Sequence, residues 1–230
     1  MSIKIENLKF SYRQDFMEEI YALHDISFSI DDGDFVGIMG HTGCGKSTLI
    51  QLIAGLLTPT SGHIYLDGED INDRSYDRNI LREKIGLVFQ YPEYQLFETT
   101  VEKDVAFGLN YSGLSKEEVS TRVQWALETM GFEYEKVRKQ SPLGLSGGEK
   151  RRVAIAGVLA TKPRIFIFDE PIAGLDPYGR RSFLQFISKM NQSGTTVIMV
   201  SHNIEALCEY TERLIVLDKG KLIESGDTTE

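Results

Sequence analysis

The segment that most constrains the fold is a glycine-rich octapeptide, Gly40-His41-Thr42-Gly43-Cys44-Gly45-Lys46-Ser47. Its pattern, G-x-x-x-x-G-K-S, binds phosphate where a strand precedes it and a helix follows it. Both neighbours are predicted here. Residues 35–39 form a short apolar run typical of a strand buried on both faces, and residues 48–57 have helical spacing. The octapeptide therefore predicts a nucleotide-binding α/β fold.

The chemistry of this loop favours a nucleoside triphosphate such as ATP, together with Mg²⁺. Glycines let consecutive backbone N–H groups turn inward around phosphates, and the start of a helix adds about half a positive charge. Lys46 is expected to reach the β and γ phosphates, and Ser47 to ligate Mg²⁺. Thr48, the next residue, is included in the predicted nucleotide site.

A second chemical signal is the acidic pair Asp169 and Glu170, which follows the apolar run at residues 165–168. The run predicts a buried strand, and ligand sites of α/β proteins form at the carboxyl ends of such strands. Asp169 suits the Mg²⁺ shell, whereas Glu170 suits a base or orienting group for the attacking water. The alternative is a solvated strand end or a helix cap.

The rest of the chain reads as an antiparallel region, a helical lobe and further α/β steps. Alternating apolar residues between 3 and 30 predict half-buried antiparallel strands. Helical spacing between 101 and 130, with Ser115 and Glu118 as a capping box, predicts the lobe. The later steps predict a mainly parallel sheet. They are a helix over 147–161, a strand over 165–168, a helix over 177–191, a strand over 195–200 and a helix over 204–210.

Composition and charge argue against several classes of function. The 25 basic and 34 acidic residues give a formal net charge of -9, which argues against a nucleic-acid partner. Cys44 and Cys208 have no disulfide or zinc-site spacing, which fits a reducing cytoplasm. No apolar run approaches the roughly 18 residues needed to cross a bilayer, and the N-terminus shows no secretory signal. Any membrane association is therefore expected to be peripheral.

The ordered set of motifs carries a family resemblance. It consists of the octapeptide at 40–47, Gln90, Leu145-Ser146-Gly147-Gly148-Glu149, Asp169-Glu170, Gly174-Leu175-Asp176 and His202. The chain thereby resembles the ATP-binding cassette (ABC) ATPases over nearly its whole length. The resemblance implies a RecA-like, mainly parallel sheet with an N-terminal antiparallel β region and an inserted α-helical lobe. We expect one ABC ATPase domain over 1–230, with the core at approximately 1–90 and 162–230 and the lobe at approximately 91–161.

The resemblance assigns roles to three residues outside the octapeptide. It implies that Tyr12 stacks on adenine, that Gln90 contacts Mg²⁺ and the attacking water, and that His202 contacts the γ-phosphate. Tyr12 could instead be a strand tyrosine that packs on its neighbours. A lone Gln or His would likewise be structural without the other motifs.

Ser146, Gly147 and Gly148 match the family's signature segment, which contacts ATP held by a second cassette. The resemblance thus implies that catalysis needs a head-to-tail pair of cassettes. Asp176 matches the segment that joins the two cassettes. Ser146 and Asp176 are also plain helix N-cap candidates.

Cys44 occupies a free position of the octapeptide, beside Lys46 and a helix N-terminus, where a thiol is expected to be reactive. We therefore expect thiol alkylation to block ATP hydrolysis and ATP to protect, although for native function an accidental filler is the better interpretation.

Two further segments, residues 90–97 and 152–160, look like those of the ATPases of energy-coupling factor (ECF) transporters, and more like the second ATPase type than the first. These bacterial importers take up vitamins or transition-metal ions. The resemblance implies a second, similar ATPase, a membrane-embedded coupling protein and a small substrate-binding membrane protein, at the cytoplasmic face of the cell membrane. Tyr94, Leu96 and Phe97 would form a groove for a partner helix. Alternatively they close the core of the lobe.

Two features depart from the family pattern. Ile172 stands where members usually have threonine, and most ECF ATPases continue for several helices beyond a point like Glu230. The alternatives are an ATPase of a conventional ABC importer or exporter and, less favoured, a soluble ABC ATPase in translation or DNA repair. The soluble class usually carries tandem cassettes or a long coiled-coil insertion, and this sequence shows neither.

Overall fold

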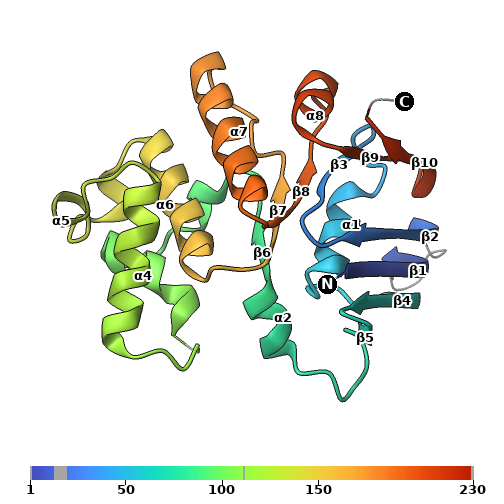
Figure 1. The fold of residues 1–230 in the computed structure, drawn as a ribbon, viewed down its shortest axis with the longest axis horizontal. Helices are drawn as coiled ribbons and strands as arrows, with labels where there is room; N and C mark the ends of the chain where they lie inside the picture. The colour runs from blue at the N-terminus through green and yellow to red at the C-terminus, as the bar shows by residue number, and fades with distance from the viewer. Residues whose placement is uncertain (1, 13–19, 111, 229–230) are drawn as a thin grey trace.

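A computed structural model describes residues 2–12, 20–110 and 112–228 of the chain. Figure 1 shows an antiparallel sheet at one end, a helical lobe at the other and a second sheet between them. The strands are β1 Ser2–Tyr12, β2 Ile20–Asp31, β3 Phe35–Met39, β4 Ser61–Leu66, β5 Glu69–Asp70, β6 Ile85–Val88, β7 Ile165–Asp169, β8 Thr196–Val200, β9 Arg213–Asp218 and β10 Lys221–Asp227. The helices are α1 Lys46–Ile53, α2 Arg78–Lys84, α3 Val101–Ala106, α4 Lys116–Thr129, α5 Tyr134–Val137, α6 Gly147–Ala160, α7 Pro177–Gln192 and α8 Ile204–Tyr210.

The central sheet has the strand order β10-β9-β3-β8-β7-β6. β3 pairs in parallel with both β8 and β9, and β7 pairs in parallel with both β6 and β8, whereas β10 is antiparallel to β9. Because β3, β7 and β8 run in parallel, their carboxyl ends meet at one edge. This arrangement confirms the mainly parallel α/β core.

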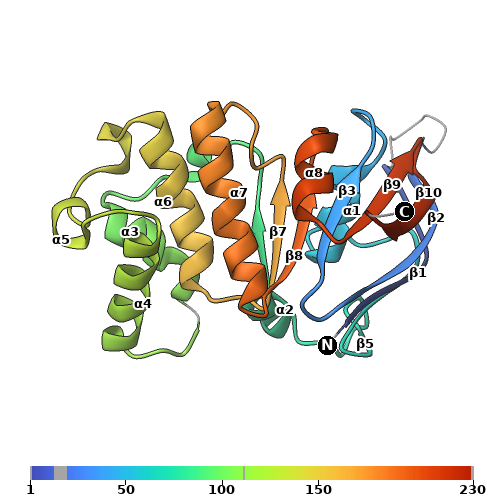
Figure 2. The ribbon, with the colours of Figure 1, turned by 45° about the horizontal axis from the view of Figure 1, so that its top comes forward.

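The antiparallel sheet has the order β2-β1-β4-β5, and β1 pairs with β2 and β4. Its alternating apolar residues point to one side, where Ile3, Ile5 and Ile26 are almost fully buried. The predicted antiparallel region is confirmed. Figure 2 shows this sheet curving around the end of the molecule that carries α1.

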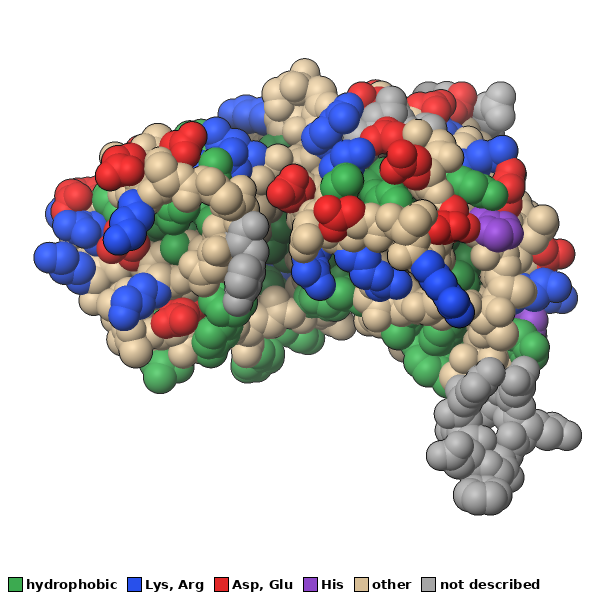
Figure 3. Space-filling model, turned by 90° about the horizontal axis from the view of Figure 1, so that it is seen from below, with side chains coloured by type: hydrophobic (Ala, Val, Ile, Leu, Met, Phe, Trp, Pro, Cys, Tyr) green, Lys and Arg blue, Asp and Glu red, His purple; other side chains and the backbone are tan. Residues whose placement is uncertain are grey.

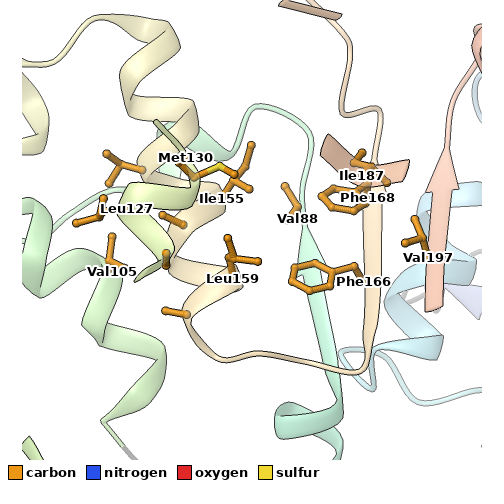
Figure 4. Packing of buried hydrophobic residues seen from close by; sticks show 14 of the residues in the cluster. Val88, Val105, Leu127, Met130, Ile155, Leu159, Phe166, Phe168, Ile187 and Val197 are labelled. Carbon is orange, nitrogen blue, oxygen red and sulfur yellow. The ribbon is translucent and has the colours of Figure 1, made fainter. Parts of the chain in front are cut away.

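The central strands are buried on both faces, and successive residues belong to different cores. In β7, Phe166 and Phe168 face a cluster shared with the helical lobe, whereas Ile165 and Ile167 face a cluster shared with α1 and the antiparallel sheet. This alternation follows from the two-residue period of a strand. Figure 4 shows the first cluster running from α4 and α6 across β6 and β7 towards Val197 of β8. The short apolar runs therefore mark strands with two buried faces.

The helical lobe, α3 to α6, is inserted between β6 and β7, which are neighbours in the sheet. Ser115 and Glu118 form the predicted capping box at the start of α4. The helical spacing between 101 and 130 is divided, because α3 ends at Ala106 and a 3-10 turn precedes α4. The lobe packs on the sheet through α6.

Some boundaries differ from those predicted. The helix predicted over 48–57 is α1, which begins at Lys46 and ends at Ile53 because Gly55 adopts a φ of +69° that a helix does not allow. The sequence patterns did not predict α2, α5, β9 or β10.

Within the described ranges, no helix has both the length and the apolar character required to cross a membrane. Figure 3 shows acidic and basic side chains close together on one face of the molecule.

Candidate nucleotide site

The octapeptide wraps around the end of β3 and the start of α1. Gly45 is the N-cap of α1 and has a φ of +106°, and a Cβ at this position would lie 2.7 Å from the backbone oxygen of Ala22. A side chain is thus excluded by conformation and by space. The loop leads directly into the N-terminus of α1, where free backbone N–H groups favour an anion.

Lys46 spans the loop. Its Nζ donates to the backbone oxygens of Gly40, at 2.7 Å, and His41, at 3.0 Å, and the residue is almost entirely buried. The ammonium group is therefore held at the centre of the loop, where it can attract phosphate oxygens.

Asp169, the last residue of β7, lies beside Ser47. Burial raises the pKa of the Asp169 carboxyl, the hydrogen bond with Ser47 opposes this, the charge of Glu170 raises the pKa further, and Lys46 lowers it. A hydroxyl and a carboxylate that lie next to each other suit Mg²⁺, which takes few protein oxygens and completes its shell with water and phosphate. No group of three or more His, Cys, Asp and Glu that could hold a metal occurs in the described part of the chain. The residues thus fit a cation shared with a nucleotide.

Glu170 follows Asp169 in a left-handed conformation, with a φ of +48°. Its backbone N–H donates to the backbone oxygen of Val200 at 2.9 Å, which ties it to the end of β8. His202 Nδ1 lies 2.9 Å from Glu170 Oε2, and the Ser201 hydroxyl donates to the same oxygen at 3.4 Å. The ends of β7 and β8 therefore bring the predicted carboxylate and histidine together, as their shared sheet edge predicts.

These groups line one cavity of about 470 Å³. Tyr12 stands at its rim with about half of its surface exposed, and its hydroxyl lies 3.1 Å from Thr48 Oγ1. The lining residues are Tyr12, Ala22, Thr42, Gly43, Gly45, Lys46, Ser47, Thr48, Gln90, Asp169, Glu170 and His202. Ala22 is the one lining residue that the sequence did not single out.

The predicted signature residues lie elsewhere. Gly148 and Asp176 line a separate hollow of about 630 Å³, with Arg151 and Tyr178. Ser146 and Asp176 are helix N-caps: Ser146 forms a capping box at the start of α6, and the Asp176 carboxylate accepts from the N–H of Gly179 at 2.6 Å. Ser146, Gly147, Gly148 and Asp176 are therefore not among the residues around the phosphate loop of their own chain.

Two octapeptide side chains turn away from the cavity. His41 Nε2 lies 2.7 Å from Asp218 Oδ1 on β9. Cys44 is fully buried in the core beneath the antiparallel sheet, with its Sγ 4.0 Å from Lys46 Nζ. This burial argues against the expected reactivity of the Cys44 thiol, because reactivity requires access to the sulfur.

The sequence patterns did not indicate a role for Arg151 of α6 or for Ser201 at the end of β8. Arg151 is buried and donates to the backbone oxygens of Pro171 and Ala173. An arginine in the second turn of a helix gives no pattern that distinguishes it from a solvated one. Ser201 could have been found from its position between a buried strand and His202.

Fold and site together define a phosphate-loop ATPase of the ATP-binding cassette type. Residues 23–173 match the profile of the ABC transporter family, so the chain belongs to that family. Within it, the chain belongs with the energy-coupling factor transporter ATP-binding proteins. It is 52% identical to EcfA2 of Clostridium acetobutylicum and 50% identical to EcfA2 of Clostridium perfringens, over all of this chain and 81% of each relative.

Solved structures agree with this assignment. The cbiO1 subunit of the cbiONQ ABC transporter complex from Clostridium perfringens is 37% identical, with a TM-score of 0.85 over 99% of this chain and 88% of cbiO1. A dimeric ATP-binding cassette in a post-hydrolysis state with ADP and Pi is 35% identical, with a TM-score of 0.85 over 98% of each chain. The chain is therefore an ABC ATPase.

Proposed function

We propose that this chain binds and hydrolyses ATP to energise an ECF-type membrane importer of vitamins or transition-metal ions. The observation that carries the proposal is the single cavity that joins the phosphate loop, the acidic pair at 169–170 and His202. The names of the EcfA2 relatives support the transporter class. The proposed unit is one domain over 1–230, with a nucleotide-binding core at approximately 1–90 and 162–230 and a helical lobe at approximately 91–161.

Each residue of the cavity has a proposed task. The backbone N–H groups of 40–47 and Lys46 bind the phosphates, and the exposed ring of Tyr12 stacks on adenine. His202 contacts the γ-phosphate, and Glu170 orients the attacking water and accepts its proton.

Ser47, Asp169 and Gln90 would hold Mg²⁺. When bound, the cation neutralises charge that develops on the phosphate oxygens. Asp169 and Lys46 are both largely buried, so solvent screens the attraction between their charges less than it would at the surface.

Pairing with a second ATPase is part of the proposal. The free N–H groups at the N-terminus of α6, at Gly147 and Gly148, suit a phosphate, yet they are not among the groups around the phosphate loop of their own chain. A head-to-tail pair brings each such N-terminus to the nucleotide of the other cassette, and Asp176 then lies at the junction. The dimeric state of the cassette with ADP and Pi supports pairing as such.

The membrane partner is proposed to dock on an aromatic surface, defined as Tyr94, Phe97 and Phe107. Their exposed fractions are 85%, 63% and 47%, and the Phe97 and Phe107 rings meet edge to face at 4.8 Å. Leu96 is partly buried against the core of the lobe, and it also lines a hollow of about 400 Å³ together with Phe97 and Phe107. An exposed aromatic surface on a rigid support suits an apolar helix of the coupling protein, which would hold this chain peripherally at the cytoplasmic face of the membrane.

The catalytic assignment is tested by Glu170→Gln. Glutamine keeps the size and a hydrogen-bonding oxygen but cannot take a proton, so the rate of phosphate release should fall by roughly 10²-fold or more while ATP affinity is retained. Glu133→Gln, at a carboxylate 73% exposed on the lobe, is the matched control. Hydrolysis by Glu170→Gln at the wild-type rate would show that another group acts as the base.

The transporter assignment is tested by affinity purification from gently solubilised host membranes, followed by mass spectrometry. The expected result is a second, similar ATPase with two dissimilar membrane proteins. A single type of permease, or ribosomal or DNA-repair proteins, would contradict the ECF assignment and leave the ATPase chemistry intact.

A further inference from the structure

Arg151 is a buried cation in the second turn of α6, with 8% of its surface exposed. Its Nη1 donates to the backbone oxygen of Ala173 at 2.8 Å, and its Nη2 donates to that of Pro171. One planar guanidinium thus donates hydrogen bonds to two backbone carbonyls of the segment that follows Glu170. Lysine can reproduce this arrangement only in part, because its ammonium is a single point charge that can bond one of the two carbonyls.

The segment bound by Arg151, residues 171–173, sets the position of Glu170. The left-handed conformation of Glu170 costs about 1–2 kcal/mol in a non-glycine residue, so surrounding contacts must hold it. The N–H of Ala173 donates to the backbone oxygen of Glu170 at 3.2 Å, and the Ile172 side chain is buried in the core of the lobe. Arg151 is bonded on both sides of Ile172, and it therefore helps to fix the turn that begins at Glu170.

On its other side Arg151 lies near the loop that follows β6. This loop contains the 3-10 turn η1, Pro92–Gln95, which packs against α6. Glu93 in η1 has a buried Oε2 atom that finds no hydrogen-bond partner among the described residues. Burial lowers the pKa of Arg151, and the negative charge of Glu93 in the adjacent η1 opposes that effect.

A third contact connects the same two segments. A Cβ at Gly174 would lie 4.0 Å from Cε1 of Tyr91, so the ring of the residue after Gln90 borders the segment after Glu170. Tyr94 of the aromatic surface lies in η1, and Phe97 lies two residues after its end. Arg151 therefore stands between the surface proposed for the membrane partner and the carboxylate proposed for hydrolysis.

We propose that Arg151 is a positioning residue for hydrolysis, which fixes Glu170 through the backbone at 171–173 and uses Glu93 of η1 as its charge partner. A displacement of η1 by a docked partner then changes the position of Glu170. The inference rests on the proposed function, because it takes Glu170 as the group that acts on the attacking water.

The test measures kcat and KM for ATP, with excess Mg²⁺, in the complex purified from host membranes. Arg151→Gln should lower kcat by about 10- to 100-fold, the range caused by a small misplacement of a catalytic group, and leave KM within about twofold. Arg151→Lys should recover part of kcat, since an ammonium keeps the charge and bonds one carbonyl. Arg122→Gln is the matched control, because Arg122 Nη1 also donates to a backbone oxygen of the lobe, that of Thr161 at 3.3 Å.

Glu93→Gln should lower kcat by about two- to fivefold, and the double variant Glu93→Gln/Arg151→Gln should be no slower than Arg151→Gln alone, because residues acting as one unit are not additive. A wild-type kcat in Arg151→Gln, no rescue by lysine, or additive effects would overturn the inference. If Arg151→Gln does not fold, a wild-type kcat in Glu93→Gln overturns it. If Glu170→Gln is inactive while Arg151→Gln is fully active, the inference about Arg151 is wrong but the proposed role of Glu170 stands.

Discussion

Replacing Phe97 with alanine should separate partner binding from ATP chemistry. Phe97 belongs to the aromatic surface and does not line the nucleotide cavity. Its ring contacts Phe107 edge to face, and 63% of the residue is exposed to solvent. Truncation therefore removes apolar area that is available to a docked helix and leaves every group around the phosphate loop unchanged.

The size of the effect follows from the exposed fraction. Full burial of a phenylalanine side chain contributes about 1.5–3 kcal/mol, so the 63% that is exposed in the free chain offers about 1–2 kcal/mol to a partner. That corresponds to binding weaker by about 5- to 30-fold. Losing the aromatic pair with Phe107 should lower the free energy of unfolding by about 0.5–1.5 kcal/mol.

The assay is a titration of the chain onto the detergent-solubilised coupling protein, beside phosphate release without that protein. Ile223→Ala is the matched control, because Ile223 is 60% exposed on β10 at the end of the molecule away from the helical lobe. Phe97→Ala should weaken binding and keep the rate of phosphate release, while Ile223→Ala should change neither. Equal losses of binding and hydrolysis in Phe97→Ala, or binding equal to that of Ile223→Ala, would refute the reasoning.

Two further predictions concern buried groups of the site. Asp169→Asn should abolish Mg²⁺-dependent hydrolysis but raise the free energy of unfolding at pH 7, because burial raises the pKa of Asp169 and the ionised form is disfavoured in the native state. This gain in the free energy of unfolding should shrink as the pH falls through the raised pKa of Asp169, because the native carboxyl then becomes neutral. Urea unfolding at several pH values measures the gain, and a gain that grows in acid contradicts the prediction. Native protein treated with a maleimide should be labelled at the exposed Cys208 and not at the buried Cys44, with hydrolysis retained. Mass spectrometry of peptides locates the label, and native modification of Cys44 contradicts the burial argument.

The sequence predicted the core of the fold because its signals are local. A strand buried on both faces, such as 165–168, needs apolar residues at every position, and the glycines of 40–47 have no substitute in a loop of this shape. The antiparallel pair β9 and β10 was missed, since its burial alternates incompletely: Ile215 and Leu217 are buried, whereas most of β10 is exposed. Helix α2 was missed because its only buried residue is Leu81.

The site was predictable to the extent that its residues follow strand ends. Asp169, Glu170 and His202 come together because β7 and β8 are parallel neighbours. The orientation of the Cys44 side chain could not be predicted, because residues in loops lack the regular period that fixes side-chain direction in helices and strands. The contacts of Arg151 were equally hidden, because they join segments that only tertiary packing brings together.

The insertion of the helical lobe between β6 and β7 also governs the order in which the chain can fold. The two strands pair directly, yet residues 89–164 separate them in sequence. Closing so long a flexible loop has an entropic cost, which falls once the intervening segment has folded and brought its own ends together. Helices such as α4 and α6 form from local contacts and can do so early. Early folding of the lobe would therefore lower the entropic cost of pairing β6 with β7.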